Sequence, residues 1–320
     1  PITQSRLDIA LFPESGDLVD GLPTRVYFRA TDAAGEAAHA DVELLDDAGD
    51  VVAHGAVEMA GLGVLTFTPH TGRTYSLRSR SPSHLTLRGD VPAVQTSGVT
   101  LTASTDVQPA GAPLSVRVTS TLSGTHTVTA SLRGFEIAKT TVDLVAGQAA
   151  DVALRPTVDA GGAVRVTVSD PTGLPRAERL FARAAPHRVD LAITTDRAAY
   201  APGDRVNASV LATDERGRPV KAVLGVTVSD QAVRRLADDR DPANLPVHFL
   251  LGQSVDRLEQ AALFTDGPQA ARATDLLLGV QGWRRFVWQD LATWTKDHPD
   301  RVAAIEPVAK PLQEARQAGV

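Results

Sequence analysis

The side chains that could do chemistry in this chain of 320 residues are scattered rather than grouped. The chain has eight histidines and no cysteine, which excludes disulfides, thiolate metal sites and a cysteine nucleophile. The sequence also lacks the motifs of a zinc-protease helix, a nucleophile elbow, a phosphate-binding loop and a dinucleotide-binding turn. We therefore expect a protein that is not an enzyme, with no catalytic residues, no cofactor and no metal.

Three short patterns offer local alternatives. Asp238, Asp239 and Asp241 supply the oxygen ligands that calcium prefers, but the intervening arginine and the missing glycine turn favour a solvated loop. His248 titrates near neutral pH, yet no second histidine or carboxylate lies beside it at metal-ligand spacing, so we expect a structural residue. Asn207 begins a glycosylation sequon within an expected strand, and we interpret this as a chance match.

All the tryptophans of the chain fall near its C-terminal end, together with two arginines. Tryptophan and arginine are the residues that most often anchor protein interfaces. The candidate interface residues are Trp283, Arg284, Arg285, Trp288 and Trp294. The alternative is that these rings close a helical hairpin onto the third sandwich, as large aromatic side chains on an amphipathic helix usually do.

Composition excludes several classes of partner. The formal charge is -6, and neither the 32 basic nor the 38 acidic residues form a block, so we expect no nucleic-acid partner. No apolar run approaches the roughly 20 residues that span a bilayer. The chain begins with proline and lacks a signal-type apolar stretch, which we interpret as a trimmed or processed chain.

An internal repeat indicates the organisation. Three segments each place a Gly/Pro turn before an alternating strand: residues 21–30 (GLPTRVYFRA), 111–118 (GAPLSVRV) and 202–210 (PGDRVNASV). Taking Val26, Val116 and Val206 as equivalent gives two spacings of 90 residues (116 − 26 and 206 − 116). This spacing suits sandwich domains of about 100 residues.

Apolar residues alternate with polar ones along many short segments, as in strands with one buried face. Turns such as residues 47–50 and 69–72 separate several of them. The expected inward residues are Leu7, Ile9, Leu11, Val26, Phe28, Ala30, Val42, Leu44, Leu65, Phe67, Tyr75 and Leu77; then Val99, Leu101, Val116, Val118, Val128, Ala130, Leu132, Val142, Leu144, Val152, Leu154, Val164, Val166 and Val168; then Leu191, Ile193, Val206, Ala208, Val210, Leu224, Val226 and Val228.

After Ser229 the period changes from that of a strand to that of a helix. Ser254 is a predicted N-cap for a short helix that carries Val255, Leu258 and Ala262. Pro268 then stands at the first position of a second helix. The apolar stripe of this second helix contains Leu276, Val280, Trp283 and Val287.

The predicted fold class is mainly β, with consecutive immunoglobulin-like β-sandwich domains and a C-terminal helical segment. The predicted boundaries are residues 1–94 and 95–186 for two sandwiches, 187–232 for the start of a third, 233–295 for a helical insertion or hairpin, and 296–320 for an extended tail or linker.

Several motifs resemble those of one family, the bacterial alpha-macroglobulin-like proteins built from macroglobulin domains. Residues 11–23 (LFPESGDLVDGLP) resemble the opening of such a domain, with Ser15 in place of the more usual glycine. Residues 61–69 (GLGVLTFTP) are similar to a later hairpin of the same domain. Residues 200–204 (YAPGD) with 217–220 (GRPV) look like the start of a subsequent domain, and residues 226–230 with 276–286 resemble a segment of envelope-associated members.

The resemblance implies an internal fragment of a much longer protein that lies outside the cytoplasm, in the periplasm or at the cell surface. It implies other domains of the same polypeptide as partners, together with proteases or envelope proteins. Covalent trapping of a protease needs a thioester between a cysteine and a glutamine, and this chain has no cysteine.

The sequence supports three hypotheses of function. The leading one is a non-catalytic macroglobulin-domain scaffold that mediates protein interaction or protease inhibition. The second is a purely structural spacer in an adhesive or surface array. The third, an enzyme without a known motif, requires a deep pocket with clustered carboxylates or histidines.

Overall fold

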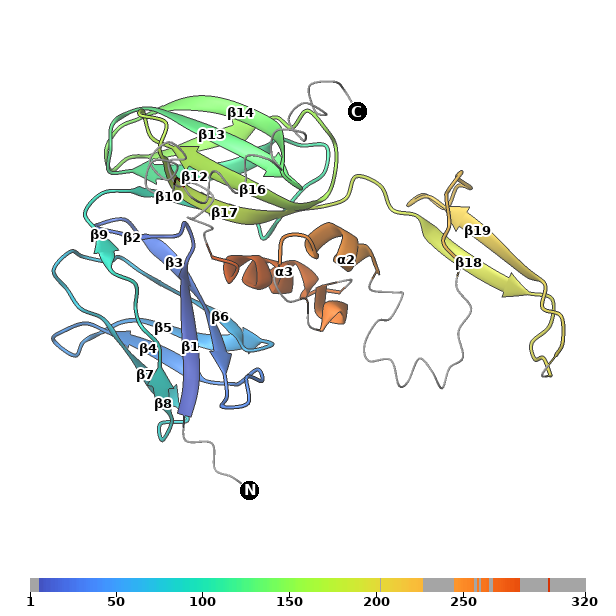
Figure 1. Cartoon of the computed structure of the whole chain (residues 1–320), viewed down its shortest axis with the longest axis horizontal. Coiled ribbons are helices and arrows are strands. Elements are labelled where there is room, and N and C mark those ends of the chain that lie inside the picture. Colours follow the sequence, from blue (N-terminus) through green and yellow to red (C-terminus); the bar gives the residue numbers. More distant parts are fainter. Residues whose placement is uncertain are drawn as a thin grey trace. The chain divides into compact units, whose positions relative to one another are not determined.

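The computed structural model describes residues 6–201, 203–226, 245–255, 258, 260–264, 267–282 and 299. The chain divides into two compact units, Pro1–Gly282 and Trp283–Val320, and every described residue except 299 lies in the first. Strands far outnumber helices among the described residues, and the helices follow the strands in the chain (Figure 1). The predicted fold class is confirmed.

The first sandwich is a seven-stranded sheet that folds over on itself, with the strand order β7-β4-β5-β6-β3-β1-β8. Strand β5 belongs to both layers, because its first part pairs with β4 and its end pairs with β6 beyond a register shift. The strands are β1 (Arg6–Pro13), β2 (Leu18–Val19), β3 (Thr24–Thr31), β4 (Asp41–Leu45), β5 (Val51–Met59), β6 (Leu62–Phe67), β7 (Ser76–Ser81), β8 (Thr86–Arg88) and β9 (Val94–Gln95), of which β2 and β9 form a separate parallel pair.

The second sandwich packs a three-stranded sheet, β10-β12-β15, against a five-stranded one, β11-β17-β16-β13-β14. Its strands are β10 (Val99–Ala103), β11 (Val107–Gln108), β12 (Leu114–Ser120), β13 (Gly124–Leu132), β14 (Phe135–Leu144), β15 (Ala149–Leu154), β16 (Gly162–Ser169) and β17 (Pro175–Arg183).

Alternation explains both cores. Inward positions such as Phe28 in β3 and Val118 in β12 are fully buried, while their neighbours along each strand face outward or toward another segment. Six strands of the two sandwiches were not predicted from the sequence, namely the short β2, β8, β9 and β11 and the longer β5 and β17. β5 carries exposed valines at its start, and β17 is buried along most of its length, so neither shows a clear period of two.

Four hairpin turns share one construction, an aspartate followed three residues later by a glycine. In each turn the Oδ1 of Asp32, Asp46, Asp170 or Asp214 accepts hydrogen bonds from the backbone N–H groups two and four residues ahead. The glycine has a positive φ of 74° to 87°, a conformation that other residues adopt at a cost. The turn predicted at residues 47–50 therefore begins one residue earlier, at Asp46.

The third unit supplies one hairpin, β18 (Asp190–Thr195) paired with β19 (Ala208–Thr213). Val206 precedes the strand, and Leu224 and Val226 are not in a strand, so the prediction for these three positions is wrong. A two-stranded ribbon has no opposing layer of its own, so alternation does not lead to burial here. Val228 lies outside the described residues.

The first predicted helix is misplaced. Helix α2 runs over Leu245–Leu251, and Ser254 lies in the turn after it rather than at a helix N-cap. Pro246 sits in the first turn of α2, where a missing N–H costs nothing. A 3-10 helix, η2 (Ala261–Phe264), follows.

The second predicted helix exists as α3 (Ala270–Gly279), which starts two residues after Pro268. Leu276 and Val280 are buried as expected, but so is every residue from Ala273 to Gly279, because α3 contacts strands of both sandwiches. Trp283 and Val287 lie outside the described residues, as does the tail from 296 apart from residue 299. The predicted domain boundaries stay predictions, and no described helix is long and apolar enough to cross a membrane.

The hydrogen bonds of the turn at Asp170 predict how the stability of the chain depends on pH. Burial alone would raise the pKa of this carboxyl, but hydrogen bonds from Thr172, Arg176 and Leu174 outweigh burial and lower the pKa to about 2. Because this value lies below the ordinary 3.8, the contribution of Asp170 to stability is present above pH 3.8 and is lost as the pH falls toward 2. Asp170→Asn should therefore lower stability at neutral pH and reduce its loss in acid, measured by urea unfolding from pH 2 to 7. Parallel stability curves for the two proteins would contradict this account.

Candidate functional site at the junction of the two sandwiches

The residues singled out in the sequence do not form a site in the described structure. The candidate interface residues Trp283, Arg284, Arg285, Trp288 and Trp294 and the aspartates of residues 238–241 lie outside the described residues. His248 is exposed on α2, and Asn207 is held by a hydrogen bond from its Nδ2 to Asp196 (2.9 Å). Within the described ranges, no group of three or more histidines and acids is placed to hold a metal ion.

The structure instead brings together a set of charged side chains where α3 meets both sandwiches. We call this set the junction cluster. It consists of Glu14, Arg25 and Tyr27 from the first sandwich, Arg179 from the second, and Arg272 and Asp275 from α3.

Arg179 lies at the centre of the junction cluster. Its side chain is 2% exposed and forms ion pairs with Glu14 through Nη1 and with Asp275 through Nη2 (2.6 Å). Its Nη2 also donates to the Tyr27 hydroxyl (2.7 Å), and its guanidinium lies over the rings of Tyr27 and Phe181. One side chain of β17 therefore binds a loop, a strand and a helix that are far apart in the sequence.

Burial shifts two of the ionisable groups strongly. It lowers the pKa of Arg179 to about 10, although the negative charge of Asp275 opposes the shift. It raises the pKa of the Tyr27 hydroxyl well above its usual value, and Asp275, which accepts a hydrogen bond from that hydroxyl (2.9 Å), raises it further. Tyr27 is therefore a neutral donor and Arg179 a cation at neutral pH.

Two more arginines flank this centre on its solvent side. Arg25 donates to Glu14 through Nε (2.9 Å) and Nη2 (2.5 Å). Arg272 donates to Glu58 in β5 (2.8 and 2.5 Å) and to Asp275 (3.1 Å). Arg272 also lies 3.9 Å from Asp106, so these two arginines and Arg179 pair with four carboxylates, and the buried Glu14 and Asp275 each face more than one cation.

Ser15 forms further hydrogen bonds between the two sandwiches. Its hydroxyl accepts a hydrogen bond from the N–H of Leu101 in β10 (2.7 Å) and donates to the carbonyl of the same residue (3.2 Å). The carbonyl of Ser15 also accepts a bond from the N–H of Glu178 (3.3 Å). A glycine at position 15, the more usual residue in the resembling motif, would lack both side-chain bonds.

Apolar packing surrounds the polar cluster. A third core, separate from those of the sandwiches, joins α2, η2 and α3 to strands of both sandwiches. Gly279 is required here, since a Cβ at this position would come within 2.3 Å of the Tyr27 ring. The buried members of this core are Tyr27, Leu62, Ala163, Leu180, Ala182, Val247, Leu251, Val255, Phe264, Ala273, Leu276, Leu277, Leu278 and Val280.

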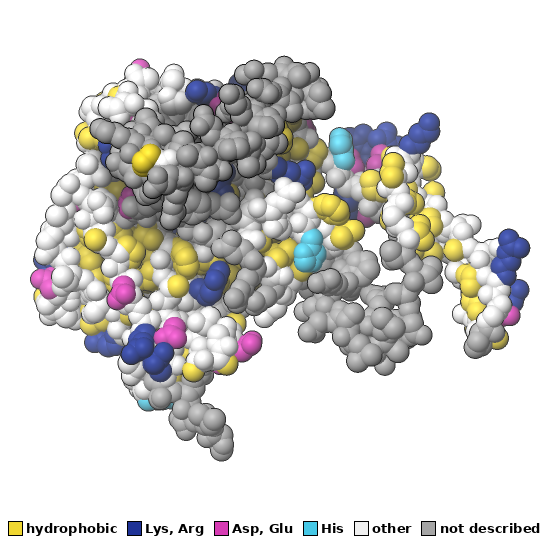
Figure 2. Space-filling model, in the orientation of Figure 1, with side chains coloured by type: hydrophobic (Ala, Val, Ile, Leu, Met, Phe, Trp, Pro, Cys, Tyr) yellow, Lys and Arg dark blue, Asp and Glu magenta, His cyan; other side chains and the backbone are white. Residues whose placement is uncertain are grey.

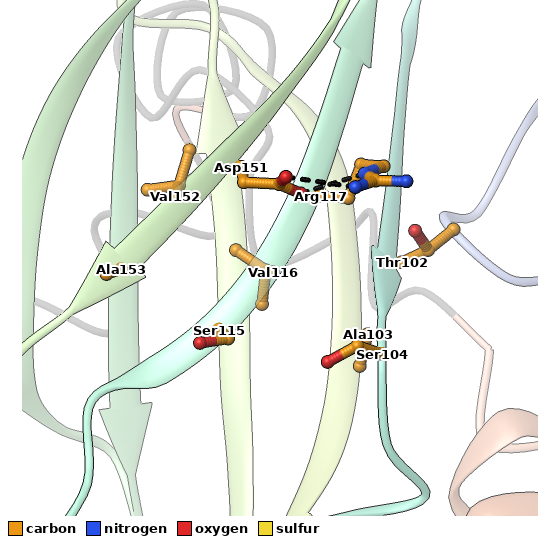
Figure 3. Close-up of a pocket in the computed structure, with 9 residues that line it drawn as sticks. All are labelled: Thr102, Ala103, Ser104, Ser115, Val116, Arg117, Asp151, Val152 and Ala153. Atoms are coloured by element: carbon orange, nitrogen blue, oxygen red, sulfur yellow. Dashed lines mark hydrogen bonds and ion pairs between the residues drawn. The ribbon is translucent and has the colours of Figure 1, made fainter.

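Three hollows in the described structure are lined by residues outside the junction cluster. The one in Figure 3, of about 470 Å³, lies along the three-stranded sheet of the second sandwich, where Arg117 and Asp151 form a two-bond ion pair (2.8 and 2.9 Å). One of about 550 Å³ lies between β7 and the segment after β8, and an apolar one of about 320 Å³ lies between α2, α3 and β17. None of these three is lined by a histidine or by two carboxylates. No residue of the junction cluster lines any of these three hollows.

Some residues of the junction cluster, and the neighbouring Ser15, could have been noticed in the sequence. Glu14 and Ser15 lie in residues 11–23, a segment that stood out only for its family resemblance. Asp275 is a lone acid beside three consecutive leucines, and an unpaired acid in such a helix would be costly to bury. Arg179 offered no comparable signal, because β17 shows no clear alternation.

Similarity to known proteins is confined to solved structures, since no family model and no curated protein matches the chain. The chain is similar at 12% identity to the native conformation of E. coli alpha-2-macroglobulin, with 68% of this chain and 17% of that chain covered and a TM-score of 0.23. It is also similar to the E. coli adhesin FdeC (15% identity, 69% and 77% covered, TM-score 0.26) and to domains 4–9 of the surface layer protein SbsC (12%, 66% and 37%, TM-score 0.29). These neighbours are a macroglobulin, an adhesin and a surface layer protein, and the chain spans only part of each.

The junction cluster predicts a large effect of one substitution. Arg179→Met replaces the guanidinium by a shorter, unbranched apolar side chain and leaves Glu14 and Asp275 buried with less compensation, which should cost about 3–5 kcal/mol of unfolding free energy. Urea unfolding measures this loss. The control is Arg117→Met, which breaks an equally well-aligned but exposed pair and should change stability little. Equal effects of the two substitutions would contradict the assignment.

Proposed function

We propose that this chain is a non-catalytic scaffold of immunoglobulin-like domains within a larger cell-envelope protein, and that it mediates interaction with other proteins. The junction cluster carries this proposal. The ion pairs of Arg179 and the hydrogen bond at Ser15 hold the two sandwiches and α3 together. They produce a rigid body with a fixed spacing between its surfaces. A scaffold that presents binding surfaces requires such rigidity.

The location in the envelope and the macroglobulin type rest on the resemblance of residues 11–23, 61–69 and 200–204. On that basis we propose the periplasm or the cell surface, with proteases or envelope proteins as partners. Protease inhibition is the finer form of the proposal. It would need a segment that a protease cuts and a body that then retains the protease.

The absence of an enzyme site is also a proposal. Its support is that the three hollows contain no clustered acids or histidines, while the strongly shifted groups at the junction are enclosed by ion pairs. Perturbed pKa values mark active sites in many enzymes, but structural ion-pair networks perturb them too. Here burial is the main cause of the pKa shifts of Arg179 and Tyr27, and both groups contact the buried Asp275.

A structural spacer is the second candidate. One observation favours it. The ion pairs of the junction cluster, which would make a scaffold rigid, would also stiffen a spacer in a surface array. The spacer and the inhibitory form of the scaffold differ in what happens when a protease attacks. A spacer resists or is cut without consequence, whereas an inhibitor keeps the protease.

Limited proteolysis with several endoproteases of different specificity tests the proposal. We expect that α3 stays bound to the two sandwiches after cuts elsewhere, because the junction cluster holds it without a covalent link, and that the protease is released. Size-exclusion chromatography with mass analysis of each peak measures both. The matched variant Arg179→Met should lose α3 after the same cuts.

Two results would change the account. Loss of α3 from the unsubstituted chain at the first cut would contradict a rigid scaffold. A shared first cut between Asp230 and Gly282 with the protease retained would favour inhibition by trapping over the scaffold alone.

A further inference from the structure

The charges where α3 meets the two sandwiches do not balance. Ion pairs link four carboxylates to three guanidiniums there, and with every group ionised this network carries one uncompensated negative charge. On the face shown in Figure 2, the acidic and basic side chains of the described residues lie dispersed in small groups, so the excess is not part of a large acidic surface on that face. The members of the network are Glu14, Glu58, Asp106 and Asp275, and Arg25, Arg179 and Arg272.

Asp106 has the weakest pairing of the four carboxylates. It lies in the segment between β10 and β11 of the second sandwich, and within the described part of the chain its one ion pair joins it to Arg272 at 3.9 Å. Glu58 accepts two hydrogen bonds from the same arginine (2.8 and 2.5 Å), and Asp275 accepts one (3.1 Å). Since Arg272 is already paired at shorter distances, the excess charge of the network is best assigned to Asp106.

The surroundings of Asp106 disfavour its charged form. The side chain is 37% exposed and interacts electrostatically with Asp275 and Arg272 of α3, Arg25 of β3 and Glu58 of β5. Burial raises the pKa of the Asp106 carboxyl, the negative charge of Asp275 raises it further, and the two arginines oppose the shift without cancelling it. The ionised carboxylate is therefore less favourable in the folded chain than in the unfolded one.

We propose that Asp106 makes the junction sensitive to pH, because its negative charge weakens the contact of α3 with the two sandwiches at neutral pH and its protonation strengthens that contact. Protonation removes the excess charge and leaves the three arginines paired with the other three carboxylates. This inference rests on the proposed scaffold function and adds a regulation to it, since the rigidity of the scaffold then depends on the acidity of its surroundings.

The direction of the shift defines the pH range. A carboxylate with a raised pKa in the folded chain destabilises the folded state fully above that raised value, and the destabilisation disappears as the pH falls to the ordinary value of 3.8. The contribution of Asp106 therefore favours a tighter junction in mild acid than at neutral pH. Asp170 acts in the opposite direction as the pH falls toward 2, so each comparison needs a substituted chain at the same pH.

The substitution Asp106→Asn in the full chain tests the proposal, because it removes the charge at every pH. Hydrogen exchange of the α3 amides, followed by mass spectrometry, compares the variant with the unsubstituted chain at one pH, so the intrinsic exchange rates cancel. At pH 7 these amides should exchange about two- to fivefold more slowly in the variant, the size expected for one charge at a partly exposed site. The difference should disappear as the pH approaches 3.8.

The matched control is Glu58→Gln, which removes another carboxylate that pairs with Arg272. Because Glu58 is closely paired, exchange of the α3 amides at pH 7 should become faster in this variant rather than slower. Equal or faster exchange in Asp106→Asn at pH 7, or a slowing that persists unchanged down to pH 3.8, would overturn the proposal. Those results would leave the scaffold function intact, which is contradicted instead by loss of α3 from the unsubstituted chain at the first proteolytic cut.

Discussion

A guanidinium removed from water costs several kcal/mol unless carboxylates and hydrogen-bond acceptors surround it, and both Nη atoms of Arg179 have such partners, from three separate segments, while its buried Nε has none. Glu14 comes from the loop after β1, Tyr27 from β3 and Asp275 from α3. Moving any one of these segments away would remove an ion pair or a hydrogen bond from the buried Arg179. The arrangement of the two sandwiches and the helix depends on this constraint more than on any single apolar contact.

The apolar core around α3 and the polar cluster act together. Apolar burial supplies a driving force without direction, whereas the ion pairs specify which residues must meet. Ser15 adds specificity at the other side of the boundary through its two bonds to Leu101. The chain has no cysteine, so non-covalent contacts must do here what disulfides do in many small secreted domains.

Alternation in the sequence predicted most strands of the two sandwiches, because inward positions such as Val118 and Val128 recur at a strict period of two. It failed for β17, where segments on both faces bury the strand, and for the third unit, where alternating residues such as Val226 have no opposing layer to pack against. The position of α2 was missed because Ser254 offered a plausible cap that the chain does not use. Arg179 could not be found from sequence, since its partners are brought to it only by the tertiary fold.

The central claim is that α3 and the two sandwiches form one cooperative body through Arg179. Native-state hydrogen exchange in increasing denaturant tests it most directly, because it measures the free energy at which each segment opens. The account predicts that amides of α3 exchange at the same opening free energy as those of β3 and β17. Exchange of α3 at a much lower free energy, with both sandwiches still protected, would contradict it.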